Sequence, residues 1–471
     1  MKDYIVLTPQ ELDIDKILSD NSTSLDNEYT LDNEYLKYLI SYILSKLAFY
    51  IENFERNKGD KYVPLAQHHI PIHSKKDVLV RPDKHKKHVE FLTSDFEEIT
   101  YRLSRTKTKQ KLISMLYRKD YEVGKVAYSY RINPRYKGQK LSLNYIHNHK
   151  LIQKIREHNS VIPSIITSGK YRFLGKYFDS SSLKINVDEA VLLSNARFSS
   201  HKDYGKYLNE MFQIIDLSNG VYRFYNKDET DARLHTNISR LPKVYRQYLT
   251  YNNNHLVEVD LSNSIIYFLS MLTSNRVNNS VLNKFPFLLM FYKTLETLDT
   301  RETDLLKELS TNGKFYDYFI PSFEDRYTSD DLTTMFEQEN DGDYNGHFDQ
   351  KRKVAKRQIL AMIFAASDAY KVEQDIFFFV FPDLLNTINA FKDKHDYEKL
   401  SHTLLQLESH YMLDVVAREF NRVNAKKAPI FTLHDCLITT QDYSTELTNT
   451  MRRVFEQEFL IAPKMESKNW K

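Results

Sequence analysis

Two short apolar stretches of the 471-residue chain each carry an aspartate at the point where the apolar run stops. The first stretch, residues 256–264, contains Asp260, and the second, residues 429–439, contains Asp435. An aspartate is a poor strand residue and is costly to bury without a partner, so two such positions indicate carboxylates brought together to hold divalent metal. Two carboxylates that share Mg²⁺ ions, near a basic helix, form the minimal set for nucleotidyl transfer.

We therefore expect Asp260 and Asp435 to bind two Mg²⁺ ions about 4 Å apart, with Mn²⁺ as a substitute, at the two ends of an in-line displacement. Metal charge would keep both carboxylates ionised despite their mutual repulsion. Taken alone, Asp260 also fits a helix N-cap, because a helix is predicted just beyond it, over residues 264–272.

A basic helix is predicted between the two aspartates, from about residue 350 to 371. Arg352 and Lys356 are four residues apart and share a face, which Leu360 and Phe364 continue. This face offers cations to a triphosphate and an apolar or aromatic platform to a base. An ordinary amphipathic helix with basic residues at its solvent end would have the same pattern.

In this order, the motifs resemble those of the single-subunit right-hand polymerase superfamily, which includes family A DNA polymerases and phage-type RNA polymerases. Residues 260–266 are similar to motif A of phage-type RNA polymerases, residues 352–365 to motif B, and residues 433–436 to motif C. Shorter similarities to upstream and palm segments of the superfamily are found at residues 233–236, 241–246, Gln406 with Glu408, and 460–464. The resemblance covers about residues 225–471. Phe364 stands where the family usually has Tyr, Ala365 replaces Gly, and Ile265 occupies the place of Glu in family A.

The resemblance implies an α+β fold: a right-hand polymerase with an antiparallel palm sheet, helical fingers and a helical basic N-terminal or thumb part. The expected regions are a helical N-terminal region (1–74), a basic thumb-like, nucleic-acid-binding region (75–215), the palm with motif A (216–275), the fingers with motif B (276–400) and the palm with motif C (401–471).

The resemblance also implies roles for individual residues. Asp260 and Asp435 would be catalytic metal ligands, with the Leu261 carbonyl as an additional oxygen ligand. Nucleotide binding would fall to four residues: Arg352, Lys356, Phe364 and Ile265. Primer or template contacts would come from His434, Arg233 and Gln406.

Residues 75–160 are strongly basic and contain interleaved tyrosines, a composition that suits a nucleic-acid backbone and its bases. We expect Lys107, Lys109 and Lys111 to contact primer or template phosphates; a solvated surface is the alternative. The single cysteine excludes an intramolecular disulfide and fits a cytoplasmic location. No run of 18 apolar residues and no signal-peptide core are found, so no membrane association is expected.

The predicted function is template-directed addition of nucleoside triphosphates to a 3′-hydroxyl, with a lean towards DNA synthesis. Alternatives are a phage-type RNA polymerase or primase, and a template-independent or protein-primed polymerase in replication or phage defence. A non-enzymatic, nucleic-acid-binding accessory replication protein is the alternative from another class. The expected partners are a nucleic-acid template, a primer and nucleoside triphosphates.

Overall fold

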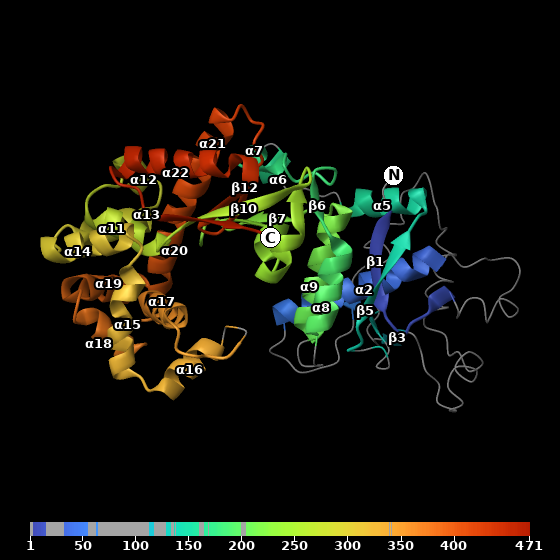
Figure 1. Cartoon of the computed structure of the whole chain (residues 1–471), viewed down its shortest axis with the longest axis horizontal. Coiled ribbons are helices and arrows are strands. Elements are labelled where there is room, and N and C mark those ends of the chain that lie inside the picture. Colours follow the sequence, from blue (N-terminus) through green and yellow to red (C-terminus); the bar gives the residue numbers. More distant parts are fainter. Residues whose placement is uncertain are drawn as a thin grey trace, which may run out of the picture. The chain divides into compact units, whose positions relative to one another are not determined.

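The computed structural model describes residues 3–15, 33–54, 63–64, 113–116, 129–132, 136, 138–159, 164–167, 169–198, 204–338, 340 and 342–471. The chain divides into two compact units (Figure 1). The first is made of Met1–Ser164, Phe178–Arg223 and Arg240–Asn252, and the second of Ile165–Tyr177, Phe224–Ser239 and Asn253–Lys471. No helix in the described part of the chain is long and apolar enough to cross a membrane.

The first unit is built on the antiparallel pair β1 (Tyr4–Pro9) and β5 (Leu141–Ile146), against which α2 (Asn33–Phe54) packs. The buried Asn219 at the end of α9 (Tyr204–Asn219) ties that helix to β1, because its side chain bonds both backbone polar groups of Ile5 at 2.8 Å. The remaining elements are α5 (His149–Asn159), α8 (Val187–Arg197), the pair β6 (Leu183–Ile185) and β9 (Leu249–Tyr251), η4 (Lys243–Tyr248), and a sheet of β2 (Val63–Pro64), β4 (Ser129–Ile132) and β3 (Ile113–Leu116).

The core of the second unit is an antiparallel sheet, in which β10 (Asn254–Leu261) lies between β12 (Cys436–Thr440) and β13 (Met465–Asn469). β11 (Phe431–Leu433) pairs with the other edge of β12. The helix that follows β10, α11 (Ser264–Thr273), is buried at every residue, as expected for a helix that is apolar on all sides. Its Phe268 stacks on Tyr411, with ring centroids 5.7 Å apart. The fully buried α11 therefore anchors the end of β10, from which it begins.

The second unit also contains most of the helices of the described chain (Figure 1). One continuous helical run consists of α20 (Tyr397–Ser409), the π-helix η5 (His410–Ala417) and α21 (Arg418–Val423). The others are α12 (Asn279–Leu282), α13 (Pro286–Leu295), α14 (Thr300–Thr311), α15 (Phe315–Arg326), α16 (Ser329–Glu337), α17 (Phe348–Phe364), α18 (Lys371–Phe378), α19 (Pro382–His395) and α22 (Ser444–Phe459). Short elements are α6 (Ser164–Thr167), α7 (Arg172–Gly175), the pair β7 (Phe224–Asn226) and β8 (Leu234–Thr236), α10 (Asn237–Arg240) and η6 (Gln441–Tyr443).

The mixture of helices with antiparallel sheet confirms the α+β class expected from the sequence. The helices expected at residues 264–272 and 397–423 are confirmed, the second with a π-helical middle. The helix expected to run to residue 371 ends instead at Phe364. Ala365 is extended and Tyr370 has a left-handed φ of 54°, so the backbone turns before α18 begins. The right-hand layout and the five expected regions remain predictions.

Candidate active site

Strand register brings the two predicted carboxylates together. Asp260 lies directly opposite Cys436 in the antiparallel pair of β10 and β12. Asp435 immediately precedes Cys436, in the two-residue loop that joins β11 to β12. The first residue of that loop, His434, has a left-handed φ of 54°, which closes the hairpin tightly. Directly opposed residues of an antiparallel pair lie about 5 Å apart, so the register alone places Asp435 beside Asp260.

The three side chains offer one compact donor set. A carboxylate oxygen from Asp260, one from Asp435 and the Cys436 sulfur all lie within 4.8 Å of one another. The Cys436 thiol donates a hydrogen bond to Asp260 Oδ1 at 3.1 Å, and its sulfur is 3.9 Å from Asp435 Oδ1. Carboxylate oxygens suit Mg²⁺ and Mn²⁺, whereas a thiolate suits softer ions. The two aspartates therefore fit a pair of hard divalent cations, whereas the Cys436 sulfur is a third donor that favours softer metal ions.

Burial, followed by the negative charge of Asp435, raises the pKa of Asp260 to about 7. The Cys436 hydrogen bond and the positive charge of Lys356 act in the opposite direction. Two carboxylates at this distance resist ionising together unless a cation compensates them, and a bound divalent ion would supply that charge.

A buried carboxylate stands behind Asp435. The Glu408 side chain on α20 is 0% exposed and forms an ion pair with Arg233. The Ser264 hydroxyl donates to Glu408 Oε2 at 2.7 Å and lies 3.2 Å from Asp435 Oδ2. Burial raises the pKa of Glu408, and Arg233 opposes that shift. Arg233 is thus linked through Glu408 and Ser264 to the carboxylate of Asp435, a role that its sequence motif did not indicate.

Gln406 and His434 lie at the border of this network. Gln406 donates from Nε2 to the Asp228 carbonyl at 2.9 Å, in the connection between β7 and β8 that leads to Arg233. The ring of His434 lies 6.4 Å from that of His235, which stacks on Tyr225 at 4.5 Å. Among the predicted primer or template residues that the structure describes, His434, Arg233 and Gln406 therefore lie near the Asp435 hairpin.

The basic face of α17 points towards the same strand end. Arg352 donates from Nε to Asp317 at 2.7 Å, and its NH2 group lies 3.3 Å from the Gly313 carbonyl and 3.5 Å from Asn263 Oδ1. Lys356 is exposed, and its charge acts on Asp260. Both cations that the sequence motif predicted therefore lie near the end of β10 that carries Asp260.

Tyr316 on α15 is a site residue that the sequence analysis missed. It is 1% exposed, and the Lys356 ammonium lies 6.0 Å from its ring centroid. Burial raises the pKa of its hydroxyl, on which the charges of Arg352, Asp435 and Glu408 also act. No local pattern marks this tyrosine among 33.

The other predicted site residues lie as follows. Leu261 is buried at the end of β10, and Ile265 is 7% exposed in the first turn of α11. Phe364 is half-buried at the last position of α17. Lys107, Lys109 and Lys111 lie outside the described residues.

Comparisons with known proteins find likenesses among solved structures alone. No protein-family model matches the chain, and no curated protein matches it. Among solved structures, the chain is similar to the POL domain of Pol1 from M. smegmatis in complex with DNA primer-template and dNTP. The TM-score is 0.37 and the identity 9%, over 68% of this chain and 74% of that one. At these values the likeness carries no argument about fold or function.

The raised pKa of Asp260 predicts an unusual pH dependence of stability without metal. The folded state holds this proton up to about pH 7, whereas the unfolded state releases it near pH 4, so stability falls as pH rises between these values. In EDTA at pH 8, Asp260→Asn should therefore raise Tm, and the gain should shrink towards pH 5. Saturating Mg²⁺ should raise the Tm of the wild type more than that of the variant.

The matched control is Glu466→Gln, on the other strand beside Asp260. The Lys464 hydrogen bond lowers the pKa of Glu466, so its neutralisation should not raise Tm at pH 8. An Asp260→Asn protein that melts no higher than the wild type at pH 8 in EDTA would contradict this account of the site.

The donor set also predicts a spectroscopic signal with a soft metal. Cys436 is the single cysteine, so a cadmium–thiolate charge-transfer band can report only on this site. Titration with Cd²⁺ should produce the band in the wild type, none in Cys436→Ser, and a much weaker affinity in the Asp260→Asn, Asp435→Asn double variant. An unchanged Cd²⁺ affinity in the double variant would show that the aspartates and the thiol do not share an ion.

Proposed function

We propose that this chain is a template-directed nucleotidyltransferase of the right-hand polymerase type, with a lean towards DNA synthesis. One observation carries the proposal: the pairing of β10 with β12 brings the Asp260 and Asp435 carboxylates together, and the cations of α17 lie near the same end of β10. The motif order of the sequence supports the same conclusion. In this proposal the sheet is the palm, and α12–α19 supply the fingers.

The residues divide the work of the reaction. Asp260 and Asp435, with the Leu261 carbonyl, would hold two Mg²⁺ ions, which activate the 3′-hydroxyl and stabilise the charge that develops on the phosphates. Arg352 and Lys356 would bind the triphosphate, because guanidinium and ammonium groups on one helix face can neutralise successive phosphates. Arg352 must then exchange its contact with Asp317 for a phosphate oxygen.

The neighbourhood of the Asp435 hairpin would receive the primer terminus. His434 is exposed in the loop next to Asp435, and the stacked pair of His235 and Tyr225 extends the aromatic surface beside it. Stacking and hydrogen bonding there suit a nucleotide end. Arg233, held by Glu408, and Gln406 would contact primer or template from the adjoining elements.

A non-enzymatic accessory role has less support, because such a protein would have no need for two partly buried aspartates at the expense of stability. Phage-type RNA polymerase, primase, template-independent and protein-primed activities use the same metal chemistry. A product assay separates them: the protein is incubated with Mg²⁺, all eight triphosphates, and DNA or RNA templates with and without primers, and the products are sequenced.

Asp260→Asn or Asp435→Asn should abolish synthesis while leaving the fold and nucleic-acid binding largely intact, because each removes a metal ligand whose role is confined to chemistry. We expect a loss of at least about 10³-fold in extension rate, on the scale of removing one group that stabilises the transition state. Asp442→Asn, at an exposed carboxylate just beyond β12, is the matched control and should be as active as the wild type. Near-normal extension by either site variant at saturating Mg²⁺ would refute the two-metal reading.

Ile265 predicts a preference for deoxynucleotides if it lies near the sugar. A 2′-hydroxyl pressed against its apolar side chain would lose hydrogen bonds with water and gain none, at a cost of about 1–3 kcal/mol. Phe364 has no hydroxyl with which to favour a ribose. Ile265→Gly should therefore relax the preference in kcat/KM, with Ile266→Val, one position further into the buried core, as the control. Equal or better use of ribonucleotides by the wild type would make RNA polymerase or primase the better name.

A further inference from the structure

Two backbone hydrogen bonds hold Lys464 next to the turn that follows Asp260. Its N–H donates to the Thr311 carbonyl at 2.8 Å, and its carbonyl accepts from the Ser262 N–H at 2.9 Å. These two bonds join the end of α14, the residue before β13 and the chain just beyond Asp260. The backbone position of Lys464 is therefore set by the same elements that position the catalytic carboxylate.

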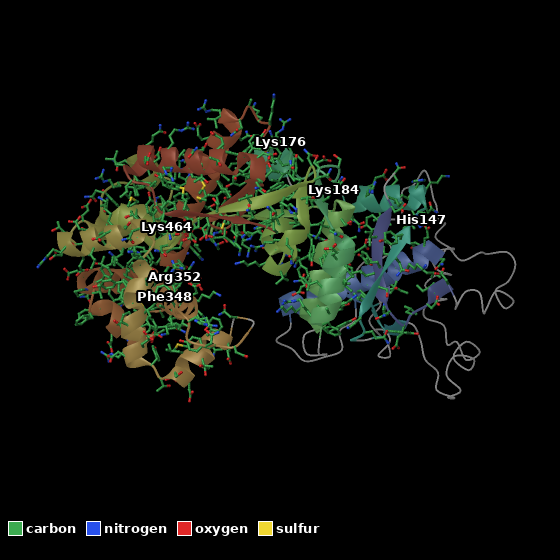
Figure 2. All side chains as sticks on the ribbon, viewed as in Figure 1. His147, Lys176, Lys184, Phe348, Arg352 and Lys464 are labelled. Atoms are coloured by element: carbon green, nitrogen blue, oxygen red, sulfur yellow. The ribbon has the colours of Figure 1, made fainter. Side chains whose placement is uncertain are left out.

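The side chain of Lys464 passes over Gly313. This glycine has a φ of +77°, and a Cβ added to it would lie 2.9 Å from Lys464 Cδ and 3.3 Å from Ser262 Cβ. The Gly313 carbonyl accepts a hydrogen bond from Arg352 at 3.3 Å. Lys464 and Arg352 thus converge on one glycine from different elements, and Figure 2 labels them in the same part of the second unit.

Both cations are held by carboxylates that can be exchanged. Lys464 Nζ lies 2.9 Å from Glu466 Oε1, and their side chains are 53% and 60% exposed. Arg352 pairs with Asp317 at 2.7 Å, and its charge also acts on Glu466. The Lys464–Glu466 pair is exposed and therefore weak, so an anion with several charges and acceptors can displace it. The Arg352–Asp317 pair is half-buried, and a phosphate oxygen would have to replace the Asp317 carboxylate there.

We propose that Lys464 is a third triphosphate-binding residue of this site, and that Glu466 holds its ammonium group in place until the nucleotide arrives. The inference rests on the proposed function and adds to it the residue that immediately precedes the last strand. Glu466 lies opposite Asp260 in the pairing of β10 and β13. The Lys464 ammonium therefore lies on the β13 side of Asp260, away from β12, and it shares the surroundings of Gly313 with Arg352. A polyphosphate needs several such charges, whereas a monophosphate does not.

The test is equilibrium binding of a deoxynucleoside triphosphate and the matching monophosphate to the full chain, with primer–template present and Ca²⁺ in place of Mg²⁺ to prevent chemistry. Lys464→Met keeps the aliphatic stem over Gly313 and removes the charge. It should weaken triphosphate binding about tenfold, the size expected for one charge-assisted contact, and leave monophosphate binding unchanged. Lys464→Arg should restore most of the loss, and Glu466→Gln should tighten triphosphate binding.

Lys468→Met is the matched control, because Lys468 lies on the same strand but opposite Glu258, further from Asp260. It should bind triphosphate like the wild type. Equal triphosphate affinity of Lys464→Met and wild type, with Arg352→Ala impaired, would overturn the role of Lys464 and leave the proposed function standing. A wild-type protein that binds no triphosphate would overturn both. Equal weakening of triphosphate and monophosphate binding by Lys464→Met would also count against the proposal, since it would indicate a general structural effect.

Discussion

The repulsion between Asp260 and Asp435 is the constraint on which the second unit depends. The pairing of β10 with β12 holds the two carboxylates together, and burial with that repulsion raises the pKa of Asp260 to about 7. A chain selected for stability alone would place a neutral residue at one of these positions. Below about pH 7 a proton on Asp260 relieves the repulsion; in the proposed function a bound divalent cation would relieve it at higher pH and offset its cost.

The surrounding elements keep the carboxylates from relaxing apart. α11 is buried along its whole length and anchors the end of β10, while the fully buried Glu408 is neutralised by Arg233 and holds Ser264 against Asp435. Removing one partner of such a buried pair leaves an uncompensated charge, so the loss of Arg233 or Glu408 would destabilise the structure behind Asp435. Arg352 and Lys464 lie at a more exposed edge, where they pair with Asp317 and Glu466. In the proposed function, the buried network holds the metal ligands and these cations exchange their carboxylate partners for phosphate.

Local sequence predicted the parts of the site that have local causes. Each aspartate interrupts an apolar run, so a strand before it could be expected. Arg352 and Lys356 have helical spacing, so a helix with both side chains on one face could be expected. The end of α17 at Phe364 could not, because Ala365 is extended there although its residue type favours a helix. The contacts that bring Glu408, Tyr316 and Lys464 to the site are not local. Glu408 contacts Arg233, Tyr316 lies near Lys356 on another helix, and the backbone of Lys464 bonds Thr311. Such roles become visible only after the fold places these side chains around Asp260.

Anomalous diffraction from crystals grown with Mn²⁺, a primer–template and a non-reactive nucleoside triphosphate is the most direct measurement of the central claim. The account predicts two anomalous peaks about 4 Å apart, both within bonding distance of oxygens of Asp260 and Asp435. It also predicts that phosphate oxygens of the bound triphosphate contact at least one of the two ions. Crystals in which the triphosphate is bound but no Mn²⁺ lies between these two carboxylates would contradict the account.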